Sequence, residues 1–263
     1  MNPAPPASTS DPHAGRAQAA RRGVCRRTAT LFLALVAGVL LGRGLPHLAG
    51  ALGVVAAGWM LASLVNHFFF RDPNPATPRD AGLLVAPAHG RVDVIEEVEE
   101  PEFLHGPARR ISIFLSVLDV HVQNAPVAAR VAWVRHRPGR FLNALRTDSA
   151  EQNEQVFIGL ESLEHPGERL AVRQIAGAIA RRIECWVREG DTVTRGQRLG
   201  LIRYGSRCDL YLPPTWSLRV SCGDRVVGGE TVVAVRNATV PPPAGEGVSP
   251  AADHPENSTR SRL

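Results

Sequence analysis

The chain contains no lysine: all 30 of its basic residues, among 263 residues, are arginine. This absence excludes chemistry that depends on a lysine amine, such as carrying a prosthetic group on a modified lysine. Aromatic residues make up only 5% of the chain, and no stretch interleaves them with basic residues. The net charge of +5 therefore does not indicate a nucleic-acid surface, and we expect no nucleic-acid partner.

Cysteine is also scarce. The four cysteines, Cys25, Cys185, Cys208 and Cys222, have neither the close spacing of metal ligands nor the density of a disulfide framework. We therefore expect no metal site, and we expect the thiols to lie in a reducing compartment.

The length suits one sizeable domain with appendages, since a domain usually takes ~100–200 residues. Residues 1–20 and 241–263 are rich in Pro, Ala, Ser and Gly without periodicity, which is typical of disordered tails. We divide the chain into a disordered basic tail (1–28), a membrane hairpin (29–70), a folded domain (71–240) and a second disordered tail (241–263).

Two apolar runs, Ala29–Gly42 and Leu48–Val65, follow an arginine-rich segment. A spanning helix needs ~20 residues, so the second run suffices and the first needs its flanks. A signal peptide is one alternative, but no small-residue cleavage site precedes the second run. We expect a helical hairpin. Arginines before the first run, and Arg71 and Arg79 after the second, predict that both ends face the cytoplasm at the inner membrane. A helix pair lying on the membrane surface is the other alternative.

Beyond the apolar runs, short segments rich in Val and Ile alternate with turn residues, which predicts a mostly β domain. One short helix is expected near Ser149–Glu154, and the acidic run Glu96–Glu100 is interpreted as a solvated turn. The predicted strands are Leu83–Val85, Arg91–Glu97, Arg110–Leu115, Ala129–Arg137, Gln155–Leu160 and Arg169–Ala176.

An internal repeat follows these strands. The pattern Val-x-x-Gly-Asp-x-Val-x-x-Gly begins at Val187 and again at Val220. Each copy looks like the hammerhead turn of lipoyl and biotinyl carrier domains, in which glycines make the tight turns. Two copies predict a β-sandwich built on two hammerhead-like repeats, preceded by the N-terminal hydrophobic helical hairpin.

The dipeptide Gly205-Ser206 lies between the two copies. A Gly-Ser bond held in a strained turn can cleave itself, because the serine hydroxyl can attack the glycine carbonyl in an N-to-O acyl shift. Elimination from the resulting ester and hydrolysis would turn Ser206 into a pyruvoyl group. An ordinary turn between strands is the alternative interpretation of this dipeptide.

The sequence around this dipeptide resembles the phosphatidylserine decarboxylases, particularly their short bacterial and archaeal branch. The resemblance extends from about Asn66 to Val235. It rests on blocks in the family's order: Phe68–Pro73, Ala86–Val92, Ile111–Val122, Pro138–Ala144, Asn153-Glu154, Gln174–Ile183 and Leu201–Pro213.

The resemblance implies a self-processing enzyme that converts phosphatidylserine to phosphatidylethanolamine and CO2. Gly205 would end the large chain, and Ser206 would supply the covalent pyruvoyl cofactor at the head of the small chain. The cofactor would bind the substrate amine as a Schiff base, and His121 would deliver a proton to Cα. The implied partners are phosphatidylserine, the membrane and the two chains of one precursor; a homo-oligomer is left open.

Two departures from the family concern the base that processing needs. The family has aspartate in a Pro-Ala-Asp-Gly block, where this chain has His89, and longer relatives have a second histidine where this chain has Asn124. We expect His89 to act as the base or to partner His121. The alternative is that processing is slow or lost.

Arginine is the natural bidentate partner of a phosphodiester or a carboxylate. Arg140, Arg203 and Arg207 lie in or beside the matched blocks and are candidates for substrate binding, although each could be an ordinary surface charge.

Two other functions remain open from sequence. One is an uncleaved, non-enzymatic membrane-anchored β-sandwich homologue, and the other is a decarboxylase of a different phosphoserine lipid.

Overall fold

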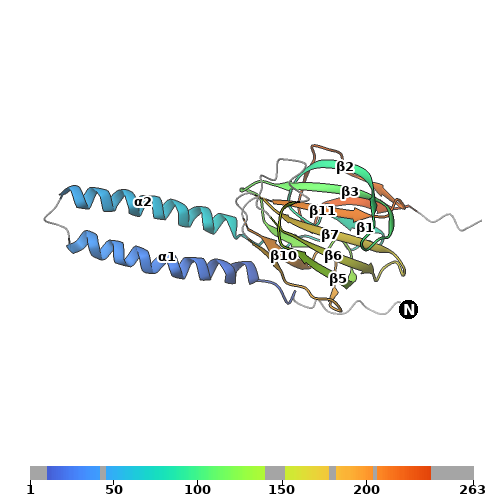
Figure 1. The fold of residues 1–263 in the computed structure, drawn as a ribbon, viewed down its shortest axis with the longest axis horizontal. Helices are drawn as coiled ribbons and strands as arrows, with labels where there is room; N and C mark the ends of the chain where they lie inside the picture. Colours follow the sequence, from blue (N-terminus) through green and yellow to red (C-terminus); the bar gives the residue numbers. More distant parts are fainter. Residues whose placement is uncertain (1–10, 42–45, 140–151, 178–181, 204–205, 238–263) are drawn as a thin grey trace, which may run out of the picture.

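The computed structural model describes residues 11–41, 46–139, 152–177, 182–203 and 206–237. The prediction of a mostly β domain behind an apolar N-terminal helix is confirmed (Figure 1). The helices are α1 (Arg16–Leu41) and α2 (Pro46–Phe69). The strands are β1 (Leu83–Val85), β2 (Gly90–Glu100), β3 (Gly106–Leu115), β4 (Val122–Asn124), β5 (Ala129–Arg137), β6 (Gln155–Ser162), β7 (Arg169–Ala176), β8 (Ile183–Cys185), β9 (Thr192–Val193), β10 (Arg198–Ile202), β11 (Ser206–Leu212), β12 (Trp216–Leu218), β13 (Arg225–Val226) and β14 (Val232–Arg236). The predicted short helix at Ser149–Glu154 falls largely outside the described residues.

Helices α1 and α2 lie side by side and antiparallel, and they project from the β domain (Figure 1). Phe32 stacks on Trp59 with ring centroids 4.3 Å apart, and Arg21 Nη1 lies 3.1 Å from His67 Nδ1 nearer the domain. Within the described residues, Gly50–Phe69 is the one segment long and apolar enough to cross a membrane. Only 6% of its hydrophobic window is buried in the protein, so its apolar surface is left for another apolar environment.

Helix α1 begins earlier than the tail predicted for residues 1–28 allows. It starts at Arg16, after a turn in which Asp11 Oδ1 accepts a hydrogen bond from the His13 amide at 2.9 Å. The His13 ring packs near Trp186 of the β domain, with centroids 6.4 Å apart. Composition favoured disorder here, but these contacts with the domain order the segment.

The strands form one large and two small antiparallel sheets. The large sheet has the order β13-β2-β3-β11-β7-β6-β5-β9, and the small ones are β1-β14-β12 and β4-β10-β8. Fully buried apolar side chains from both the large and the small sheets form one core, including Ile113, Ile158, Leu199, Leu210 and Ala234. The strand order of the large sheet places β11 in its interior, between β3 and β7.

The interpretation of Glu96–Glu100 as a solvated turn is wrong. These residues form the second half of β2 and pair with β3 as far as Glu100 opposite Gly106. Glu96 makes an ion pair with Arg110 on β3, and Glu97 with Arg109. Cross-strand pairs of opposite charge stabilise a sheet, which explains why an acidic run is tolerated in this strand.

The two copies of the repeat have matching backbone conformations. Gly190 and Gly223 have φ of 90° and 102°, and Gly196 and Gly229 have φ of 78° and 75°. In each copy the aspartate after the first glycine accepts a hydrogen bond at 2.8 Å from the amide three residues before it. Glycine is needed at these positions because other residues rarely adopt positive φ. The likeness of these turns to those of carrier domains stays a prediction.

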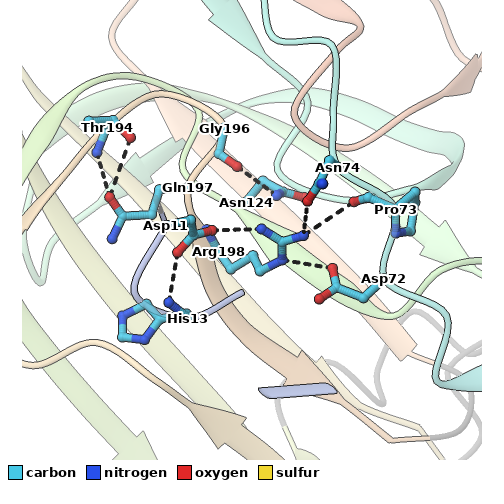
Figure 2. A network of polar contacts seen from close by, with 10 residues as sticks. All are labelled: Asp11, His13, Asp72, Pro73, Asn74, Asn124, Thr194, Gly196, Gln197 and Arg198. Atoms are coloured by element: carbon cyan, nitrogen blue, oxygen red, sulfur yellow. Dashed lines mark hydrogen bonds and ion pairs between the residues drawn. The ribbon is translucent and has the colours of Figure 1, made fainter. Parts of the chain in front are cut away.

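A buried arginine connects both ends of the hairpin to the β domain (Figure 2). Arg198, on β10, is 4% exposed and donates to Asp11 Oδ2 at 2.8 Å and to Asp72 Oδ1 at 2.7 Å. It also donates to Asn74 Oδ1 at 2.8 Å. Asp11 precedes α1 and Asp72 follows α2, so one guanidinium holds the base of the hairpin against β10.

Replacing this arginine should destabilise the protein strongly. Arg198→Met leaves the buried Asp72 carboxylate without its cation, which typically costs about 3–5 kcal/mol. We expect a loss of this size in the free energy of unfolding, measured by denaturant titration in detergent. Arg219→Met, which alters an exposed arginine, is the control and should change stability by less than about 0.5 kcal/mol. An equal change in the free energy of unfolding for the two variants would show that the buried cluster does not stabilise the attachment of the hairpin to the β domain.

Candidate active site

The Gly205-Ser206 bond belongs to the crossing between β10 and β11. Before the crossing, the Ile202 amide donates to the His121 carbonyl at 3.1 Å. After it, the Ser206 backbone pairs with Leu115 at the end of β3 and with Ala176 at the end of β7. Gly205 lies outside the described residues. The crossing is therefore anchored at both ends to the segment that runs from Leu115 to His121.

A tight turn shapes that segment. Asp119 Oδ2 accepts hydrogen bonds from the Ser116 amide at 2.8 Å and from Ser116 Oγ at 2.6 Å, while the Asp119 amide donates to the Ser116 carbonyl at 3.0 Å. Such aspartate-capped turns reverse the chain. Arg225 adds an ion pair to Asp119 Oδ1 at 3.2 Å. The turn brings the chain back beside the end of β10, where the His121 carbonyl accepts from the Ile202 amide.

The imidazole of His121 is buried and its tautomer is defined. Its Nδ1 lies 2.8 Å from the Asp119 carbonyl oxygen, which can only accept, so Nδ1 carries the proton and Nε2 is the acceptor nitrogen of the neutral ring. The ring of Phe69, the last residue of α2, packs on it with centroids 4.1 Å apart. The hairpin therefore covers one side of this histidine.

Electrostatics keep His121 neutral. Burial lowers its pKa to about 4, and the charges of Arg71 and His89 act in the same direction, while Asp119 opposes them. At neutral pH the imidazole is therefore unprotonated and can accept a proton.

His89 lies beside His121, in the turn between β1 and β2. Burial lowers its pKa, and the charge of Arg71 lowers it further. A Cβ placed on Gly228 would lie 3.0 Å from His89 Cδ2 and 3.0 Å from Asn124 Oδ1. The two positions at which this chain departs from the family pattern therefore flank the same glycine.

Gly90 fixes the backbone next to His89. Its φ is +150°, and a side chain there would collide with the carbonyl oxygen of Phe114 on β3. Only glycine allows this approach, so the strand that follows His89 is held tightly against β3.

The arginines predicted to bind substrate have other partners. Arg203 makes an ion pair with Glu184, and the buried Arg207 pairs with Asp93 at 2.5 Å. Arg140 lies outside the described residues. The structure thus places His121 against Ile202 at the end of β10, and His89 close enough for its charge to lower the pKa of His121, while a substrate role for these three arginines stays a prediction.

Sequence reasoning used Arg71 only to predict the orientation of the hairpin and assigned it no role in the site, although it lies in the Phe68–Pro73 block. Its guanidinium donates to the Leu118 carbonyl at 2.5 Å and to the Phe68 carbonyl at 3.0 Å. Burial is the main cause of the lowered pKa of both histidines, and the charge of Arg71 lowers both pKa values further. The signal that could have identified it is its position directly after the apolar run.

The candidate site does not coincide with a cavity of about 910 Å³ found on the β domain. That cavity lies against residues such as His105, Arg130, Glu161 and Arg236, and includes none of the residues described above. The site is defined instead by the backbone anchors of the crossing.

Comparison with known proteins identifies the family of the chain. The profile of the family described as phosphatidylserine decarboxylase matches residues 65–234, which include both histidines and the Gly-Ser bond. The chain belongs to the phosphatidylserine decarboxylase family. A phosphatidylserine decarboxylase proenzyme of Symbiobacterium thermophilum is 48% identical over 183 residues, covering 70% of this chain and 83% of the relative. The proenzyme of Desulfotalea psychrophila is 45% identical, covering 66% of this chain and 81% of the relative. The proenzyme of a Mycobacterium species (strain JLS) is 42% identical, covering 73% of this chain and 86% of the relative.

The lowered pKa values predict how self-cleavage of this family member depends on pH. The base must be neutral, and the pKa of His121 is lowered from 6.5 to about 4, so the rate should stay level as pH falls through 6.5 and decline only near 4. Precursor made by cell-free translation can be shifted to buffers of different pH and followed on denaturing gels. A decline centred near 6.5 would contradict the buried, neutral histidine.

The same assay separates the two histidines. We expect His121→Gln to leave an uncut precursor and His89→Ala to slow cleavage, with His89→Asp restoring it because aspartate is the family residue. Cleavage of His89→Ala at the parent rate would show that His89 is a bystander and that His121 acts alone.

Proposed function

We propose that this protein is a self-processing, pyruvoyl-dependent decarboxylase that converts phosphatidylserine to phosphatidylethanolamine and CO2. The observation that carries this proposal is the anchoring of the Gly205-Ser206 crossing to the segment that holds a buried, neutral His121. Membership of the family and the names of its relatives support the same activity.

In the proposed processing, His121 Nε2 takes the proton of the Ser206 hydroxyl, and His89 supports it. The hydroxyl oxygen attacks the Gly205 carbonyl carbon, so that an ester bond forms and the amide bond breaks. Removal of the Ser206 Cα proton then expels the Gly205 carboxylate and leaves a dehydroalanine. Hydrolysis of that residue releases ammonia and completes the pyruvoyl group.

The residues around Ser206 fit such a group. It is made from the chain itself, at a strand end that two neighbours hold in register, so it needs no separate binding site. Once formed, its carbonyl supplies an electron sink for the electrons left by departing CO2.

His121 is the residue proposed to hold the proton that replaces CO2 at the substrate Cα. Its imidazole is neutral in the free protein, but a bound carboxylate nearby favours the protonated form. Its bond to the Asp119 carbonyl fixes the ring orientation, and the Phe69 ring excludes water from one face. One buried imidazole could therefore serve both processing and turnover.

The finer features of the fold belong to the same proposal. We propose that the two glycine turns are hammerhead-like units of a β-sandwich, that residues 29–70 hold the enzyme at the inner membrane, and that residues 71–240 face the cytoplasm. The exposed apolar surface of Gly50–Phe69 and the arginines beside it support membrane attachment. The processed enzyme would consist of the large and small chains.

A decarboxylation assay on washed membranes tests this function. Membranes of cells that express the protein, in a host lacking its own decarboxylase, are washed with high salt and dissolved in detergent. They should release CO2 from carboxyl-labelled phosphatidylserine and form phosphatidylethanolamine in equal amount. Ser206→Ala should have no activity. Equal release by both proteins, or activity removed entirely by the salt wash, would contradict the proposal.

A further inference from the structure

A second cavity lies at the base of the hairpin, where α1 and the end of α2 meet the β domain. Its volume is about 560 Å³, and its lining includes Arg21, His67, Phe68 and Arg71. The cavity lies near His121, because its lining includes Phe68, Phe70 and Arg71, and Phe69 between them packs on His121.

The cavity is positively charged. Arg21 contacts His67 rather than an acid, and neither Arg21 nor Arg71 forms an ion pair with a carboxylate in the part of the chain that the structure describes. The acidic residue in the lining, Asp72, already accepts from Arg198 at 2.7 Å. A partly buried cation without a counter-ion loses hydration energy that a bound anion would restore.

Arg71 keeps donors for such an anion. A guanidinium has five N–H groups, and those of Arg71 make two described bonds, to the carbonyls of Phe68 and Leu118. The guanidinium carbon lies 3.9 Å from the centre of the Phe68 ring, which holds it flat against an apolar surface. Burial lowers the pKa of Arg71, and Asp119 opposes that effect only at a distance.

The cavity lies at the depth of lipid headgroups. The 20 residues of Gly50–Phe69 measure ~30 Å as a helix, which is the thickness of a bilayer's hydrocarbon core. Arg71 follows that segment by two residues, and Arg21 is level with its end because it contacts His67. A helix inserted over this length would place both arginines among the phosphates.

The cavity is also next to the candidate catalytic group. Phe69, between two lining residues, packs on His121 with centroids 4.1 Å apart, and Arg71 bonds to the segment that delivers His121. In a serine headgroup only one oxygen and one methylene separate the phosphorus from Cα. The site for the phosphate must therefore be close to the residue that acts at Cα.

We propose that Arg71, together with Arg21 and His67, binds the phosphodiester of the lipid substrate. This inference rests on the proposed function and specifies its substrate site. Arg71 orients the headgroup so that its serine end reaches His121, while the acyl chains stay along the exposed face of α2. Self-cleavage involves no lipid, so the loss of phosphate binding should itself affect turnover alone, although a change at Arg71 also removes its bond to the Leu118 carbonyl and can alter the rate of cleavage.

Arg71→Gln separates the two steps. We expect complete self-cleavage by mass analysis and a KM for phosphatidylserine raised by about tenfold or more, since bonds to charged groups are typically worth more than neutral ones. The kcat should stay within about threefold, with Arg71→Lys intermediate. Arg79→Gln, at an exposed arginine of the same linker, is the matched control and should behave as the parent.

Arg21→Gln provides a second variant, because its described contact is within the hairpin. It should also cleave and should raise KM. If both variants keep the parent KM, the proposal is overturned. If Arg71→Gln stays uncut, Arg21→Gln decides, and a parent KM for that variant overturns the proposal. An inactive but cleaved parent protein would instead refute the proposed function.

The source of the phosphodiester is tested with a soluble substrate. Short-chain phosphatidylserine below its micellar concentration presents the same headgroup without a membrane surface. A raised KM for Arg71→Gln on this substrate supports direct binding. A rise confined to vesicles containing phosphatidylglycerol would show general attraction to anionic membranes and would contradict the proposal.

Discussion

The arrangement of this protein depends on one buried cation. Arg198 on β10 binds Asp11 at the start of the hairpin and Asp72 at its end, so helices that otherwise project away from the domain are fixed at their base (Figure 2). From that base Phe69 reaches His121, and Arg71 reaches Leu118. Strand β10 then continues to Ile202, which bonds the His121 backbone. Strand β10 thus connects the base of the hairpin to the proposed cleavage site.

In the proposed mechanism, cleavage takes place in the crossing from β10 to β11. A Gly-Ser bond is inert in an ordinary loop, but here both sides are bonded to the segment that carries His121. Burial keeps that imidazole neutral, and a backbone carbonyl selects its tautomer. His89 and Asn124, the two departures from the family pattern, both lie beside Gly228.

Local patterns predicted much of the fold. The expected bounds of β1, β5 and β7 agree with the structure because alternating apolar residues between turns specify strands directly. The Glu96–Glu100 run was misjudged because composition alone does not show that arginines on the next strand, β3, pair with its carboxylates. The start of α1 and the role of Arg198 depend on tertiary contacts that no local pattern records. Gly205-Ser206 and the histidines were recognised through the family resemblance, not through spacing.

The central claim is that the chain cuts itself between Gly205 and Ser206, and the intact mass under denaturing conditions tests it most directly. The freshly purified protein should give two chains, one ending at Gly205 and one of 58 residues (263 − 205) that begins with a pyruvoyl group. Ser206→Ala should give one chain of the full mass. A parent protein that remains a single uncut chain after prolonged incubation would contradict the account.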